Sequence, residues 1–297
     1  MPVPAAARAA ILAWFDGRGR DLPFRRTRDP WAILVSEAMA QQTQIARVAE
    51  AWVAFMAALP TVRAVAAASP ADVLRAWRGL GYNRRATNLR RAAIAIVEEH
   101  RGEVPRDLAS LERLPGVGPY TARAVAALAF DVPVGPVDTN VRRVLRRVLA
   151  DDAEVATDRG LQHAADAAAA LGDRPGVWTH AVMDIGATLC KPRAPRCGDC
   201  PAQPWCAYAA GLGSTAPGGS RIVAGTAERP FGTTSRWLRG RILDNLRDAA
   251  PGDWAAIEAP VGIHDARAVE AALTALGAEG LAERHPTEAR LARLPLT

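Results

Sequence analysis

The chain has 297 residues, of which 49% are apolar, and its 37 lysines and arginines outnumber its 31 aspartates and glutamates to give a net charge of +6. This length allows two or three domains with a substantial core, and the composition is typical of a soluble, largely helical protein. No apolar run approaches the ~18 residues of a membrane-spanning helix. The N-terminus also lacks the basic start and long apolar stretch of a signal peptide. We therefore expect a cytoplasmic protein that does not enter a membrane.

The positive charge comes almost entirely from arginine, because Lys191 is the only lysine. Arginine makes planar, bidentate contacts with phosphate, so this excess fits a nucleic-acid partner. A genome rich in G and C would favour arginine codons in the same way. Charge alone therefore leaves both interpretations open.

The first distinctive segment is SEAMAQQTQI, residues 36–45, where one carboxylate and three glutamines stand among apolar neighbours. We expect a helix over residues 31–40, a turn at Gln41 and Gln42, and Thr43 as the cap of the next helix. Glu37 would then lie in the last turn of the first helix, where its apolar neighbours favour the protonated form. A carboxylate in such surroundings needs a partner or a chemical role.

Residues 111–130 are predicted to form a helix, a glycine-rich hairpin with the sequence LPGVG, and a second helix. Gly116 and Gly118 would let the backbone approach a ligand closely, and the amides that open the second helix could hold a phosphate oxygen.

Asp138 stands at the N-cap position of a predicted amphipathic helix over residues 141–150, which has an apolar stripe opposite four arginines. It is either a simple cap or a carboxylate that the helix N-terminus keeps ionised, able to stabilise positive charge. Glu37 and Asp138 would then differ in ionisation. Such a pair of carboxylates can cleave a glycosidic bond through an oxocarbenium-like state.

All four cysteines lie within seventeen residues, with the spacing C-x6-C-x2-C-x5-C. Clustering implies a shared ligand, and a cytosolic protein disfavours disulfides. Structural zinc sites usually use two short-spaced pairs, so a single C-x2-C with longer loops favours a [4Fe–4S] cluster over zinc. The expected ligands are Cys190, Cys197, Cys200 and Cys206.

The sequence loosens into a linker composition at residues 211–230. Two helices and a short hairpin strand are expected beyond it, which suggests a small winged-helix domain. This domain would serve either as a second DNA contact or as a protein-contact or stabilising module.

Taken together, these motifs resemble the helix–hairpin–helix base-excision DNA glycosylases, and most closely their adenine-specific MutY branch. The resemblance covers about residues 10–210 and rests on RDLPFR, SEAMAQQTQ, GLGYNRRA, LPGVGPYTA, VDTNVRRVL, MDIGATLC and the cysteine spacing. It implies an all-α fold of two subdomains with a [4Fe–4S] cluster loop, to which the tail adds a small winged-helix-like α+β domain. The expected parts are a cluster-bearing subdomain of residues 1–29 and 137–210, a helical barrel of residues 30–136 with the helix–hairpin–helix, a linker of residues 211–230, and a winged-helix-like domain of residues 231–297.

The resemblance also implies roles for the matching residues. Glu37 would protonate the adenine leaving group, and Asp138 would stabilise the sugar cation. The flipped base would lie in a pocket lined by Arg25, Tyr120 and Asn140. The expected DNA contacts are Gln41, Gln42 and Thr43 at the gap left by the base, Tyr82 beside the opposing base, and Gly116 and Gly118 at a phosphate.

The expected function is that of a monofunctional glycosylase of base excision repair, a monomer at the bacterial nucleoid that removes adenine mispaired with 8-oxoguanine or guanine in double-stranded DNA. Related endonuclease III enzymes attack the sugar with a hairpin lysine, but Tyr120 occupies that position here, so no Schiff-base lyase activity is expected. Two alternatives are a thymine or uracil glycosylase acting on guanine mismatches and a non-catalytic iron–sulfur DNA-binding protein. MutY proteins usually carry a Phe-Ser-His motif in a domain that recognises 8-oxoguanine. This chain lacks that motif, so the preferred opposing base stays open.

Overall fold

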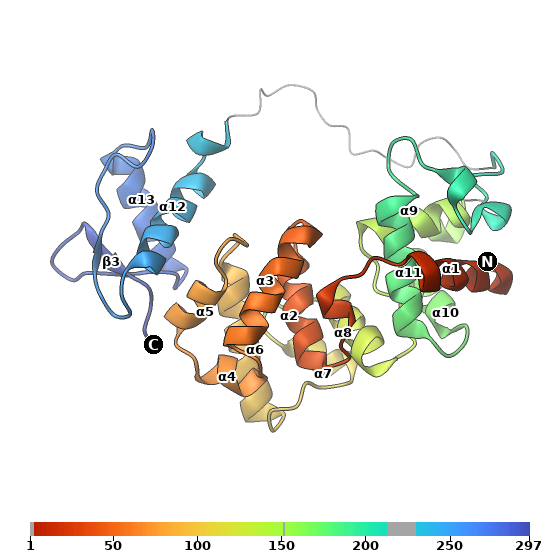
Figure 1. Ribbon diagram of the computed structural model, residues 1–297, viewed down its shortest axis with the longest axis horizontal. Helices are drawn as coiled ribbons and strands as arrows, with labels where there is room; N and C mark the ends of the chain where they lie inside the picture. Colours follow the sequence, from red (N-terminus) through yellow and green to blue (C-terminus); the bar gives the residue numbers. More distant parts are fainter. Residues whose placement is uncertain (1–2, 151, 213–229) are drawn as a thin grey trace. The chain divides into compact units, whose positions relative to one another are not determined.

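The computed structural model describes residues 3–150, 152–212 and 230–297, and this part of the chain is mostly helical, as the sequence predicts (Figure 1). None of the described helices is both long enough and apolar enough to cross a membrane.

The chain divides into two compact units. The first contains the described residues of Met1–Glu37, Val104–Arg113 and Val117–Arg221, and the second those of Ala38–Glu103, Leu114–Gly116 and Ile222–Thr297. The domain boundaries expected from the sequence stay a prediction, and most of the expected linker lies outside the described residues.

The first unit is built around α11, against which α1, α8, α9 and α10 pack (Figure 1). Its helices are α1 (Ala5–Arg18), η1 (Pro23–Arg25), α2 (Pro30–Ala40, whose last residues belong to the second unit), α7 (Leu108–Arg113), α8 (Pro119–Phe130), α9 (Thr139–Val148), η2 (Ala153–Ala156), α10 (Asp158–Ala170), α11 (Pro175–Thr188), η3 (Cys197–Asp199) and η4 (Gln203–Trp205).

The core of this unit confirms the apolar stripe predicted for residues 141–150. All five apolar side chains of the stripe are buried, and they pack with residues of α1, α10 and α11. The predicted arginine face is wrong at Arg147, whose side chain is buried and only 8% exposed. Its guanidinium donates to the carbonyls of Lys191 (2.8 Å) and Pro192 (3.2 Å). These hydrogen bonds to a distant segment stabilise the buried charge.

The predicted helix–hairpin–helix is confirmed. Helices α7 and α8 pack against each other, and the LPGVG turn connects them. Helix α8 begins with Pro119 directly after Gly118, because a proline in the first turn loses no helical hydrogen bond. This turn fixes where Tyr120 leaves the backbone.

The second unit contains α3 (Ile45–Ala58), α4 (Val62–Ala67), α5 (Pro70–Ala76) and α6 (Arg84–Glu99), with α4 and α5 packed against α6. Phe55 and Trp77, both fully buried, meet edge to face with ring centroids 6.0 Å apart. Such a pair adds to the stabilisation that burial alone provides.

The C-terminal part of the second unit contains the two expected helices, α12 (Ser235–Asp248) and α13 (Ala266–Ala278), after the short helix η5 (Phe231–Thr233). Three short strands form an antiparallel sheet in the order β1-β3-β2. Their bounds are β1 (Ala255–Ala256), β2 (Glu283–Arg284) and β3 (Leu291–Arg293). A small helical region with short strands therefore follows the helical core, and its winged-helix form stays a prediction.

Candidate active site

Glu37 lies in the last turn of α2, a helix whose other side chains are mostly buried, among them Val35 and Met39. Loss of solvent raises the pKa of Glu37 from 4.5 to about 7. A hydrogen bond from Tyr120 opposes this rise, the negative charge of Asp138 adds to it, and the positive charge of Arg25 opposes it. Burial prevails, in the direction expected from the apolar sequence around Glu37. A carboxyl with this pKa can hold a proton at neutral pH and release it to a partner.

Tyr120 stands in the first turn of α8 and donates its hydroxyl hydrogen to Glu37. Burial and the negative charges of Glu37 and Asp138 raise the pKa of Tyr120 well above its usual value of 10. Tyr120 therefore stays a neutral phenol that can only donate to the carboxylate, and it fixes the orientation of Glu37.

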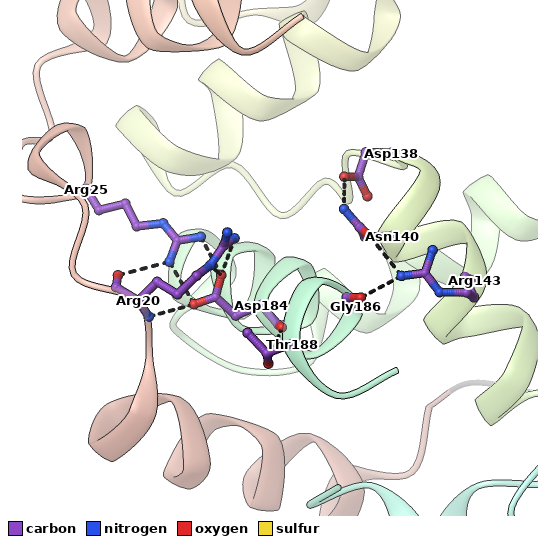
Figure 2. Close-up of polar contacts among 8 residues, drawn as sticks. All are labelled: Arg20, Arg25, Asp138, Asn140, Arg143, Asp184, Gly186 and Thr188. Atoms are coloured by element: carbon purple, nitrogen blue, oxygen red, sulfur yellow. Dashed lines mark hydrogen bonds and ion pairs between the residues drawn. The ribbon is translucent and has the colours of Figure 1, made fainter. Parts of the chain in front are cut away.

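Asp138 caps α9, as predicted from its position. One carboxylate oxygen accepts from the Val141 amide at 2.6 Å, and the other accepts from Nδ2 of Asn140 at 3.1 Å. Both oxygens are thus held by donors of the first turn of α9. Figure 2 shows Asp138 and Asn140 at the start of this helix.

Arg143 continues this network, and Figure 2 shows its bonds to Asn140 and Gly186. Its guanidinium donates to Oδ1 of Asn140 at 2.9 Å, to the carbonyl of Gly186 at 2.5 Å and to the carbonyl of Cys190 at 2.5 Å. Gly186 can lie this close to α9 because it has no side chain. A Cβ at this position would come within 2.6 Å of Asn140. Sequence analysis assigned Arg143 only to an arginine face and missed this link.

Arg25 was expected to line the base pocket, which stays a prediction, and its guanidinium is bound to Asp184. Arg25 donates to both carboxylate oxygens of Asp184, at 2.8 and 2.9 Å, and Arg20 donates to the same carboxylate through Nε (2.7 Å) and its backbone amide (2.8 Å) (Figure 2). Burial raises the pKa of Asp184, but the hydrogen bonds and charges of the two arginines outweigh it and leave the pKa below its usual value.

Asp184 is fully buried and was missed by sequence analysis, although it stands in the quoted segment MDIGATLC. An aspartate on an otherwise apolar helix face is the signal that could have found it, because a buried carboxylate needs partners. Its effect is to hold the RDLPFR segment on α11, so that Arg25 lies close enough to influence the pKa of Glu37.

The turn after α2 forms at Gln41 and Gln42, as predicted, and Gln42 adopts a left-handed conformation with φ of 57°. The prediction that Thr43 caps the next helix is wrong. The N-cap of α3 is Gln44, and the Thr43 hydroxyl accepts instead from Arg85 at 3.0 Å. A partner from a distant segment therefore takes the hydroxyl that local sequence assigned to the helix.

Arg85 holds two loops of the second unit together. One terminal nitrogen donates to the carbonyls of Ala38, Met39 and Gln41 at 2.6–3.0 Å, and the other donates to the carbonyls of Leu80 and Gly81, both at 3.1 Å. Arg85 is 9% exposed, and burial lowers its pKa to about 10. The glutamine turn and the loop with Tyr82 are thus fixed by one side chain.

The remaining predicted DNA contacts lie at glycine-rich turns. Tyr82 is 40% exposed and left-handed, with φ of 44°. Gly116 is also left-handed, with φ of 80°, and a Cβ there would come within 2.8 Å of Asn88. Gly118 faces open space beside the start of α8. The positions of Tyr82 and Gly118 leave both accessible to a ligand.

The four cysteines line one hollow, together with apolar side chains of α9 and α11, and all four are half-buried. Within the described residues, no three cysteine, histidine or carboxylate side chains come together as a site for a single metal ion. Arg147 donates to the sulfur of Cys190 at 3.3 Å. The four thiols therefore share one hollow, and the guanidinium of Arg147 lies at its wall.

Known proteins are similar to this chain in sequence. The family of HhH-GPD superfamily base excision DNA repair proteins matches residues 35–166. The adenine DNA glycosylase of Mycolicibacterium smegmatis is 43% identical over 279 residues, which cover 92% of each chain, and therefore includes much of the C-terminal region. The human adenine DNA glycosylase is 42% identical over 212 residues, which cover 68% of this chain and 39% of the human protein.

Two solved structures have a similar fold. A thermostable thymine-DNA glycosylase matches 69% of this chain and 95% of its own with a TM-score of 0.64 and 28% identity. An endonuclease III–DNA complex matches 69% of this chain and 94% of its own with a TM-score of 0.56 and 25% identity. The agreement of motifs, fold and relatives shows that the chain belongs to the adenine DNA glycosylase family of the helix–hairpin–helix base excision repair superfamily.

Proposed function

We propose that this chain is an adenine DNA glycosylase of base excision repair that removes adenine paired with 8-oxoguanine or guanine and leaves an intact abasic site. The observation that supports this most directly is the raised pKa of Glu37, about 7, next to Tyr120 and Asp138. A carboxylic acid that stays protonated near neutral pH, beside a second carboxylate, is what acid-assisted cleavage of a glycosidic bond needs.

In the proposed reaction Glu37 gives its proton to a ring nitrogen of the flipped adenine. The bond between C1′ and the base then breaks, and its electron pair leaves with the neutral base. The sugar becomes an oxocarbenium-like cation, which the carboxylate of Asp138 stabilises. Water adds to C1′, and its proton passes to a carboxylate of the pair. The products are free adenine and an abasic sugar in an uncut strand.

Tyr120 prepares Glu37 for this step. Because its hydroxyl donates to Glu37, the carboxyl is held in one orientation before the base arrives. Tyr120 offers no amine to attack C1′, and the only lysine, Lys191, adjoins Cys190. We therefore propose a monofunctional enzyme, because Schiff-base chemistry needs an uncharged amine at the sugar.

The base pocket and the DNA contacts are proposed from the same positions. Asn140 holds Asp138 and lies at the pocket, and Arg25 shapes the pocket through Asp184. We propose that Gln41, Gln42 and Tyr82 enter the duplex where the base leaves, with Thr43 as part of their support. Gly116 supports the hairpin, and the amides after Gly118 hold a phosphate.

Cys190, Cys197, Cys200 and Cys206 would hold a [4Fe–4S] cluster, which the lining of their hollow fits. When bound, the cluster supplies a rigid, redox-capable anchor for the loop after α11. Arg147 balances thiolate charge there, and Arg143 ties the carbonyl of Cys190 to Asn140. The loop is therefore connected to Asp138 by hydrogen bonds.

A panel of duplexes tests the proposal. The protein is incubated with duplexes that contain A:8-oxoguanine, A:guanine, T:guanine or U:guanine, and abasic sites are then cut with alkali. We expect cutting of the adenine duplexes only, and none in the Glu37→Gln variant. Cutting of only the T:guanine or U:guanine duplexes would replace this proposal with the activity that the similarity to the thymine-DNA glycosylase suggests. Cutting without alkali that survives Lys191→Ala would refute the monofunctional assignment.

A further inference from the structure

A basic groove runs along the second unit between α12 and the loop of residues 79–85. Its volume is about 820 Å³, and its wall also includes Gln41 and Gln42. Seven arginines line the groove, against two carboxylates, Asp244 and Glu279. The C-terminal region therefore contributes to the same surface as the residues proposed to enter the duplex.

Across this groove, Arg236 of α12 contacts Tyr82. The Arg236 guanidinium carbon lies 4.0 Å from the centroid of the Tyr82 ring, and one terminal nitrogen donates to the Tyr82 hydroxyl at 2.8 Å. One guanidinium thus makes both a cation–π contact and a hydrogen bond to a single exposed phenol. Both contacts define the ring position.

Tyr82 needs such support because its own backbone is unusual. Its φ of 44° lies in the left-handed region, and two left-handed glycines precede it, Gly79 (φ 82°) and Gly81 (φ 66°). A left-handed tyrosine is strained and persists only where neighbouring groups hold it. Arg85 donates to the carbonyls before Tyr82, and Arg236 holds the side chain itself.

Helix α12 is anchored well enough to position Arg236. At the other end of the helix, Arg247 is only 7% exposed and donates to the carbonyl of Leu74 at 2.9 Å and to Oδ1 of Asn83 at 2.6 Å. Asn83 directly follows Tyr82 in the chain. Helix α12 therefore contacts the same loop at two points, through Arg236 at Tyr82 and through Arg247 at Asn83.

We propose that Arg236 is a positioning residue for Tyr82, so that the C-terminal region determines how the enzyme contacts the base opposite the target adenine. This inference rests on the proposed function, because Tyr82 is taken to lie beside that base. Arg236 acts through the phenol ring, which it holds at one angle to the duplex. Discrimination between opposing bases then depends on a helix outside the helix–hairpin–helix core.

The test compares full-length wild type with Arg236→Ala, Arg236→Lys and Tyr82→Phe. Single-turnover rates of adenine removal are measured on A:8-oxoguanine and A:guanine duplexes. The ratio of interest is the rate on A:8-oxoguanine divided by the rate on A:guanine. Loss of one hydrogen bond and one cation–π contact should lower this ratio about five- to tenfold in Arg236→Ala. Arg236→Lys, which keeps the charge without the planar face, should fall between wild type and alanine. Tyr82→Phe should make a further Arg236→Ala change weaker than it is in wild type.

A second measurement reports the position of Tyr82 without turnover. In a Glu37→Gln background, the fluorescence of a 2-aminopurine placed beside the opposing base should increase on binding, because Tyr82 disturbs the base stack. This increase should be smaller when Arg236→Ala is added. Arg290→Ala is the matched control, because Arg290 pairs with Glu258 on the same C-terminal region and does not line the groove. Its rate ratio and fluorescence should equal those of the parent.

The outcomes separate the inference from the proposed function. If wild type removes no adenine from either duplex, the proposed function fails, whereas the fluorescence comparison still tests Arg236. If wild type removes adenine and Arg236→Ala leaves both the rate ratio and the fluorescence rise at wild-type values, Arg236 does not position Tyr82.

Discussion

Replacing Glu37 by glutamine should stabilise the folded protein more as the pH rises, while it abolishes adenine removal. In the folded protein the pKa of Glu37 is raised from 4.5 to about 7. A raised carboxyl pKa contributes stability that is fully present below the unfolded pKa and is lost as pH rises through the folded pKa. Glutamine stays neutral at every pH, so the variant keeps the part of the unfolding free energy that wild type loses as the pH rises.

The size of the effect follows from the two pKa values. At 1.36 kcal/mol per pH unit, the difference between 4.5 and about 7 corresponds to roughly 3 kcal/mol of unfolding free energy at alkaline pH. Near pH 4 the two proteins should be almost equally stable, because Glu37 is protonated in the folded state and largely so in the unfolded state. Tyr120 can still donate to the amide oxygen of glutamine, so the substitution leaves this hydrogen bond in place.

Urea unfolding without DNA, at about pH 5 and about pH 8, measures the gap in unfolding free energy between Glu37→Gln and wild type. This gap should be about 2 kcal/mol wider at pH 8 than at pH 5. Glu288→Gln, at an exposed position of the C-terminal region, is the control for the amide substitution itself. A gap of the same size at both pH values would show that desolvation of Glu37 is not what sets its proton affinity. The reasoning for a general acid at this position would then fail. In wild type, the single-turnover rate should fall as pH rises through about 7, because the proton to be donated is lost.

Three further substitutions test the rest of the site. Asp184→Asn leaves Arg20 and Arg25 without their shared carboxylate and should lower the unfolding free energy by about 3–5 kcal/mol in urea, whereas a loss below about 1 kcal/mol would contradict a tightly bound triad. Arg143→Leu should slow adenine removal about 10- to 100-fold with the absorbance of the proposed iron–sulfur cluster retained, because Asn140 loses its anchor to the loop; an unchanged rate would show that this link does not serve catalysis. Tyr120→Lys places an amine beside Asp138 and should produce a borohydride-trapped covalent complex with DNA, which wild type should not form.

Periodicity and turn chemistry predicted much of the helical structure near the site. The stripe of α9 follows from apolar spacing, and the turn at Gln41 and Gln42 follows from polar residues that interrupt an apolar helix. The N-cap at Asp138 was also predictable, because the donor it satisfies lies three residues away in sequence. Local rules succeed where both partners of an interaction are near each other in the chain.

The same rules fail where a partner comes from a distant segment. Thr43 has the side chain of a cap, but Arg85, which is 42 residues away, takes its hydroxyl. Arg147 has the spacing of a solvated face, but the loop after α11 supplies the carbonyls that bury it. Asp184 has no charged neighbour in sequence, and its partners lie more than 150 residues away. The sequence shows that such groups need partners without showing which ones.

These distant partners change the meaning of the arginine excess. Arg85, Arg143, Arg147 and Arg247 each bind two or more oxygen or sulfur atoms of other segments, so their charge is used inside the fold. A guanidinium can do this because its five donors lie in one plane and its charge persists when it is buried, whereas an ammonium is a smaller and more strongly hydrated donor. The net charge therefore overstates the number of cations that face DNA. It also explains why lysine would not replace arginine at these positions: the loops that carry Gln41, Tyr82 and Cys190 are held in place by the shape of the guanidinium as much as by its charge.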